Sequence, residues 1–177
     1  FDAGFAENHQ VPVPPLTRPE GNSGARYGMN LLPMRYESSS RTSPIFNYPY
    51  ARTRETLDTL LRQEPLDCWE GIKLRYVNPL TGGWPIPTIA AFMQLLPKGF
   101  RGQPYRSTDA SVFSVVEGSG SVCIAGQRLN FEPKDIFVVP SWAQVSLAAD
   151  QECVLFSFSD RPVQQALGLL RESRESF

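Results

Sequence analysis

The stretch from Gly99 to Val145, GFRGQPYRSTDASVFSVVEGSGSVCIAGQRLNFEPKDIFVVPSWAQV, decides the fold. Short apolar runs, such as residues 112–116 and 136–139, alternate in it with turns that contain glycine or proline. The same pattern begins near residue 72 and continues to residue 159, and it gives eight or more short strands in all. Strands of this length and spacing predict a mainly β chain that forms an antiparallel barrel or jelly roll.

The spacing G-x5-Y-x-S-x3-S-x6-G that begins at Gly99, followed by a segment from Pro133 to Val145, resembles the two motifs of the cupin family. Cupins have two His, a Glu and a later His at the positions that are here Tyr105, Ser107, Ser111 and Val145. A phenol and two hydroxyls are poor neutral ligands for a first-row metal, and valine has no donor atom. We therefore predict no metal, catalytic or cofactor-binding residue in this chain.

Substitute ligands and other binding residues are weaker candidates. Asp109 or Glu117 in place of the missing ligands would leave a site with oxygen donors only. Arg101 and Arg106 are placed to hold a carboxylate by bidentate pairing, although surface arginines paired with Asp109 or with solvent are the simpler interpretation.

Three aromatic residues are candidates for a pocket lining, although core packing is the default for such side chains. They are Trp84, Phe113 and Trp142. The segment 117–121 resembles a phosphate-binding loop only in composition, and we predict a hairpin turn there.

Composition excludes several classes of protein. The chain has 177 residues, of which 41% are hydrophobic and 20% charged, and its net charge is −1. This fits one domain with extra segments, and it does not favour nucleic acid or an anionic membrane as a partner. The first ten residues have no secretory pattern, which predicts a cytoplasmic protein, and the absent initiator Met suggests a fragment of a longer one.

The reactive residue types are few and scattered. Cys68, Cys123 and Cys153 form no C-x-x-C pair, so we expect reduced thiols, with the last two packed in strands. His9 is the single histidine, which excludes both a catalytic triad built around a barrel histidine and a site with several histidine ligands.

Four segments are expected along the chain. Residues 1–49 form an extended arm that lies on this barrel or on a neighbouring domain, and residues 50–66 hold a helix that packs on the barrel. Thr53 is its expected N-cap, and residues 57, 60 and 61 form its apolar stripe. Residues 67–160 form the barrel and residues 161–177 a C-terminal helix. This last helix is capped by Ser159 or Asp160, has Pro162 in its first turn, and packs through residues 163, 166, 167 and 170.

Several longer strings resemble the C-terminal half of gentisate 1,2-dioxygenases, and the resemblance covers nearly the whole chain. The strings are residues 30–33, 43–50, 73–79, 81–83, 92–97, 115–118, 135–142 and 155–164.

The resemblance implies a bicupin enzyme that cleaves gentisate with O2 to give maleylpyruvate. It implies ferrous iron held by three His of an N-terminal cupin, which is this chain's partner, and a homotetramer. No ligand of that iron maps onto a residue of this chain, so the fragment alone is expected to be inactive and structural.

Two alternatives stay open. One is part of a salicylate or 1-hydroxy-2-naphthoate dioxygenase, and the other is a non-catalytic ligand-binding cupin. An isomerase that works without metal fits poorly, because such chemistry uses a histidine base and the barrel has none.

Overall fold

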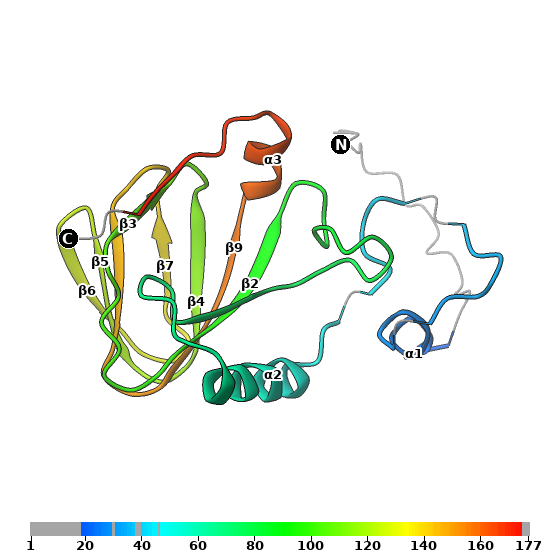
Figure 1. The fold of residues 1–177 in the computed structure, drawn as a ribbon, viewed down its shortest axis with the longest axis horizontal. Coiled ribbons are helices and arrows are strands. Elements are labelled where there is room, and N and C mark those ends of the chain that lie inside the picture. The colour runs from blue at the N-terminus through cyan, green and yellow to red at the C-terminus, as the bar shows by residue number, and fades with distance from the viewer. Residues whose placement is uncertain (1–18, 30, 38–39, 46, 175–177) are drawn as a thin grey trace, which may run out of the picture.

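The computed structural model describes residues 19–29, 31–37, 40–45 and 47–174, and in them two antiparallel sheets face each other (Figure 1). The first sheet has the strand order β1-β2-β9-β4-β7 and the second the order β10-β3-β8-β5-β6. The strands are β1 Ile72–Arg75, β2 Ala90–Leu96, β3 Tyr105–Ser107, β4 Ser111–Glu117, β5 Gly120–Ile124, β6 Gln127–Phe131, β7 Ile136–Val139, β8 Val145–Ala149, β9 Cys153–Ser159 and β10 Glu172–Arg174. The mainly β, antiparallel architecture predicted from the sequence is confirmed.

The main core fills the space between the two sheets. Phe113 and Phe137 stack with ring centroids 4.9 Å apart, and Phe131 from the second sheet stacks on Phe137 at 5.6 Å. These rings and the valines and leucines around them are the inward half of each strand's alternation, because successive side chains of a strand point to opposite faces.

Helix α2, Tyr50–Gln63, covers the outer face of the first sheet at β1 and β2 (Figure 1). Leu57 is fully buried there against Ile72, Met93 and Leu95, so the predicted apolar stripe is confirmed. The predicted cap is wrong: Pro49 is the N-cap, and Thr53 lies inside the helix and accepts a hydrogen bond from the Tyr76 hydroxyl at 3.3 Å.

The part of the outer face formed by β4, β7 and β9 is apolar and exposed. Val138, Val112 and Phe158 are register neighbours on it, and Ile136 lies on the same face with 68% of its surface exposed. Val138 and Phe158 are 54% and 40% exposed. Among the described residues, no helix packs on this row.

The arm contacts this barrel through its last part. Ser43 donates a backbone hydrogen bond to the Pro85 carbonyl at 2.7 Å, the Tyr48 hydroxyl donates to the Val77 carbonyl at 2.9 Å, and Ile45 is buried. One short helix, α1 Asn22–Tyr27, interrupts the predicted irregular segment.

The C-terminal helix is much shorter than predicted. Helix α3, Arg161–Ala166, has Asp160 as N-cap and proline in its first turn as expected, but Leu167 is 65% exposed rather than inward-facing. Gly168 has φ +68°, a left-handed conformation that ends a helix. The chain then forms β10, which pairs with β3.

The turn at residues 117–121 is not a hairpin, contrary to the prediction. β4 pairs with β7 and β9, whereas β5 pairs with β6 and β8, so this turn carries the chain from one sheet to the other. Gly118, at φ +76°, makes the change of direction.

Candidate functional site

A cavity of about 290 Å³ opens at one end of the space between the sheets. Six of its lining residues come from the first sheet and its loops: Glu70, Lys73, Arg75, Trp84, Phe92 and Ser111. The other six come from β3, the loop after it, α3 and β10: Tyr105, Ser107, Asp109, Arg161, Glu172 and Arg174. Three of the four cupin ligand positions, Tyr105, Ser107 and Ser111, therefore line one cavity.

The fourth position, Val145, lies in the core beside this cavity. Val145 is the register partner of Tyr105 on the adjacent strand and is only 2% exposed. The Tyr105 ring packs on the same apolar cluster and forms the floor of the cavity. Burial, and then the negative charges of Glu70 and Asp109, raise the pKa of the Tyr105 phenol well above its usual value. The phenol is thus neutral at physiological pH.

Ser107 and Asp109 belong to a hydrogen-bonded ion cluster on one wall. The Ser107 hydroxyl donates to Asp109, and Arg161 reaches the same carboxylate at 3.5 Å. Arg161 also pairs with Glu172 on β10, so one guanidinium joins α3, the loop after β3, and the last strand. Burial alone would lower the pKa of Arg161, but Glu172 and Asp109 raise it, and the arginine stays charged.

A second ion cluster lines the same cavity and shares strand β10 with the first. Glu70 accepts from Lys73 at 2.5 Å and from Arg174 at 2.8 Å, and Arg174 also reaches Asp67 at 3.4 Å. Burial tends to raise the pKa of Glu70, but the two cations, Lys73 first, outweigh it and hold that pKa below its usual value. Glu70 is therefore an anion whose charge is already neutralised.

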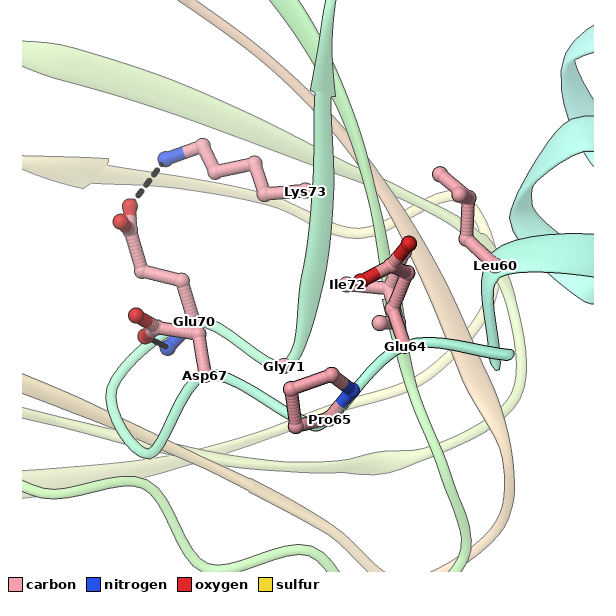
Figure 2. A pocket seen from close by; sticks show the side chains of 8 residues that line it. All are labelled: Leu60, Glu64, Pro65, Asp67, Glu70, Gly71, Ile72 and Lys73. Atoms are coloured by element: carbon pink, nitrogen blue, oxygen red, sulfur yellow. Dashed lines mark hydrogen bonds and ion pairs between the residues drawn. The ribbon is translucent and has the colours of Figure 1, made fainter. Parts of the chain in front are cut away.

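Figure 2 shows that Glu70 and Lys73 also line a neighbouring hollow of about 260 Å³ between the end of α2 and the start of β1. Its other walls are backbone, Leu60, Pro65 and the carboxylates of Glu64 and Asp67. The Asp67 carboxylate accepts backbone hydrogen bonds from Trp69 and Glu70 at 2.9 and 2.8 Å, which closes the turn that positions Glu70. Asp67, Glu70 and Lys73 are already engaged in the turn and the ion pair, which favours a structural role for this hollow.

Arg75 differs from the other cations of the cavity. Its guanidinium carbon lies 5.3 Å from the centre of the Trp84 ring, and among the described residues its side chain forms no ion pair or hydrogen bond. Trp84 is held by its indole N–H, which donates to Gln165 at 2.9 Å, and by edge contact with Phe92 at 5.6 Å.

The predicted carboxylate-binding arginines lie elsewhere. Arg101 pairs with Asp150 at 3.2 Å and donates to the carbonyls of Phe100 and Ala149, and Arg106 is exposed on β3. Neither lines the cavity, whereas Lys73, Arg75, Arg161 and Arg174 do and were missed. The alternation of charged and apolar residues in segment 72–77 could have indicated the first two of these cations. Lys73 and Arg75 are two positions apart on one strand, so their side chains must face the same side of the sheet.

The predicted aromatic lining is right for one residue of three. Trp84 lines the cavity, Phe113 lies in the main core, and Trp142 is 42% exposed. Glu117 lies instead against α2, where it accepts from the Tyr50 hydroxyl at 2.5 Å, and His9 lies outside the described residues.

The similarity to known proteins extends over nearly the whole chain. It is 51% identical over 174 residues to gentisate 1,2-dioxygenase 1 of Aquipseudomonas alcaligenes, a match that spans 98% of this chain and 50% of that protein. The chain is homologous to one half of a gentisate 1,2-dioxygenase. A Streptomyces gentisate 1,2-dioxygenase is 33% identical over 184 residues, again with 50% of its length covered. No family model matches the chain.

Solved structures agree with this assignment and establish the cupin fold. Salicylate 1,2-dioxygenase from Pseudoaminobacter salicylatoxidans, in a structure of its adducts with gentisate, superposes with a TM-score of 0.82 at 32% identity. The match covers 88% of this chain and 44% of that one. The chain thus spans about half the length of the relatives it matches, which agrees with the predicted C-terminal cupin half of a bicupin.

The iron implied by the gentisate dioxygenase family does not fit the donor set of this cavity. Tyr105 is a neutral phenol, the Ser107 hydroxyl is already used by Asp109, and Val145 has no donor. The described residues also contain no group of three or more His, Cys, Asp or Glu that could hold a metal ion. In the part of the chain that the structure describes, no helix is long and apolar enough to cross a membrane.

Proposed function

We propose that this chain is the non-catalytic cupin half of a dioxygenase that cleaves the ring of a small aromatic acid, with gentisate as substrate and with the iron held by the other half. The observation that carries the proposal is the set of side chains at the four cupin ligand positions. Three of them line the cavity as hydroxyl groups and the fourth is a buried valine. That set supplies no imidazole and no free carboxylate.

Gentisate is favoured over the alternative substrates by the relatives' names and identities. The gentisate enzyme of Aquipseudomonas alcaligenes is 51% identical, whereas a 5-aminosalicylate 1,2-dioxygenase from Comamonas is 32% identical over 142 residues and a 1-hydroxy-2-naphthoate dioxygenase from Nocardioides 29% over 165. A reaction on one of these related acids is the second candidate.

The proposed role of this half is to cover its partner and to supply contacts between subunits of a tetramer. Support comes from the apolar row on β4, β7 and β9, where Ile136, Val138 and Phe158 are largely exposed. Contiguous exposed apolar residues on a sheet face are typical of a surface that another domain covers. We also propose a cytoplasmic location, which three cysteines without a disulfide support.

The test compares the 177-residue chain with a protein that also carries the other half. Both are incubated with ferrous iron under nitrogen, and bound iron and gentisate ring cleavage are then measured. We expect near-zero iron and no turnover in the chain alone, and one iron per subunit with turnover in the longer protein. Stoichiometric iron in the chain alone would overturn the proposal.

Two substitutions make the test specific to this cavity. Asp109→Asn and Ser107→Ala remove the carboxylate and hydroxyl that an unexpected metal would use. We expect both to leave the iron content and turnover number of the longer protein within about twofold of the unsubstituted protein. Loss of half or more of the iron in either variant would place a metal in this half.

A further inference from the structure

The cavity at the cupin ligand positions has a surplus cation. Its lining contains four basic side chains, on residues 73, 75, 161 and 174, and three acidic ones, on residues 70, 109 and 172. All three carboxylates are engaged by Lys73, Arg161 or Arg174, which leaves Arg75 without an acidic partner among the described residues. A cavity of this kind attracts a single negative charge.

The surroundings of Arg75 favour a carboxylate on a ring. The Arg75 guanidinium carbon lies over the Trp84 ring, 5.3 Å from its centroid, and a guanidinium without another partner can bind a carboxylate through two parallel hydrogen bonds. Trp84, Phe92 and Tyr105 supply aromatic walls within the same lining. The other nine of the twelve lining residues are charged or serine, so polar groups outnumber the aromatic ones, and about 290 Å³ lies at the small end of the range of small-ligand pockets.

Two hydroxyl groups in the cavity are available to a ligand. The Tyr105 and Ser111 hydroxyls line it, and neither forms a hydrogen bond with another described residue. By contrast, the Ser107 hydroxyl is engaged by Asp109. Each free hydroxyl can donate to or accept from a polar substituent on a bound ring.

We propose that this cavity binds a small aromatic monocarboxylate, whose carboxylate pairs with Arg75 and whose ring lies among Trp84, Phe92 and Tyr105. The proposal does not depend on the proposed function: a chain that holds no iron and turns over no gentisate still binds the acid here. The two ion clusters hold the lining side chains in place before the ligand arrives.

The test is calorimetric titration of the chain with three probes at low ionic strength, where charge pairing is least screened. The probes are benzoate, benzyl alcohol, which has the ring without the charge, and acetate, which has the charge without the ring. We expect benzoate to bind at one site per chain and the other two to bind at least about tenfold more weakly. Quenching of the Trp84 fluorescence should follow the same order.

Variants assign the binding to the cavity. Arg75→Gln should weaken benzoate at least about tenfold, and Arg75→Lys should lie between it and the unsubstituted chain, because lysine keeps the charge but not the fork. Arg101→Gln, which removes an exposed arginine outside the cavity, should leave the affinity unchanged. Arg75 is itself exposed, so its replacement is not expected to unfold the chain, and circular dichroism checks this.

Several results would overturn the proposal. They are no benzoate binding, equal binding of benzoate and benzyl alcohol, unchanged affinity in a folded Arg75→Gln chain, and tighter binding of inorganic phosphate than of benzoate. The last result would show an anion site without a preference for a ring.

Discussion

Glu70 accepts a hydrogen bond from Lys73 at 2.5 Å at the start of β1, and this pair lines both of the hollows described above. Glu70→Gln should lower the free energy of unfolding at pH 7 by about 1 to 3 kcal/mol, because it leaves Lys73 and Arg174 without their shared carboxylate. Urea unfolding measures the change.

The effect of Glu70→Gln should depend on pH with a defined sign. The folded-state pKa of Glu70 lies below its ordinary value of 4.5, so the carboxylate stabilises the fold fully above that value and loses this contribution as pH falls through the folded pKa. The difference between the two proteins should therefore be large at pH 7 and shrink towards pH 3. Glu132→Gln, at an exposed site, is the control that should show little difference at either pH. A gap for Glu70→Gln that stayed constant with pH would contradict the ion-pair explanation.

Arg161 should hold the last strand in place. Its guanidinium pairs with Asp109, whose side chain is only 5% exposed, and with Glu172 on β10. Arg161→Met should cost about 3 kcal/mol, because it leaves Asp109 buried without a cation, and it should speed amide hydrogen exchange in residues 172–174. Hydrogen exchange read by mass spectrometry measures the second effect.

Two further variants distinguish loss of the ion pair from a general destabilisation of the fold. Adding Asp109→Asn to Arg161→Met should recover part of the lost stability, since no uncompensated charge is then buried. Arg106→Met, on the neighbouring strand β3 but exposed, should leave the exchange of residues 172–174 unchanged. Equal acceleration by both arginine variants would mean that β10 does not depend on Arg161.

The strands and the core could be predicted from sequence because both follow local alternation. In segment 72–77 the alternation of apolar and charged residues is visible in the sequence, and by itself it predicts one buried face and one solvated face. In the structure the apolar residues Ile72, Leu74 and Tyr76 face α2, and the charged Lys73 and Arg75 line the cavity. A helix can cover either face of an edge strand. Packing between distant segments decides which face it covers, and the local sequence pattern does not.

The cavity and strand β10 could not be predicted for a related reason. The cations that surround the cavity lie on β1, α3 and β10, between residues 73 and 174, and only the closure of the two sheets brings them together. β10 has a polar sequence without alternation, and its pairing with β3 spans more than sixty residues. Its Arg174 is held by Glu70 and Asp67 rather than by an apolar face.

The three cysteines should differ strongly in reactivity. Cys153 is buried and its thiol donates to the Ser119 carbonyl at 2.9 Å, and burial and then the Asp150 charge raise its pKa to about 11. At pH 8 it is a buried neutral thiol, whereas Cys68 is exposed. Iodoacetamide should therefore label Cys68 at least about tenfold faster than Cys153, since the thiolate is the reactive form. Mass spectrometry of timed samples measures both rates, with labelling in urea as the control that should equalise them. Faster labelling of Cys153 in the folded chain would contradict its placement in the core.

The turn from β4 to β5, one of several that cross between the sheets, should be intolerant of any side chain at Gly118. A β-carbon at this position would lie 1.9 Å from the carbonyl oxygen of Glu152, and the backbone there has φ +76°. Gly118→Ala should thus cost about 3 kcal/mol or more, because the backbone of Glu152, just before β9, must move. Gly126→Ala is the matched control: its φ is +84°, but no atom lies within 4 Å of the added carbon. It should cost only the left-handed strain of about 1 to 2 kcal/mol. Thermal and urea unfolding of both variants measure the difference, and equal losses would mean that the close approach of Gly118 to Glu152 does not constrain the crossing between the sheets.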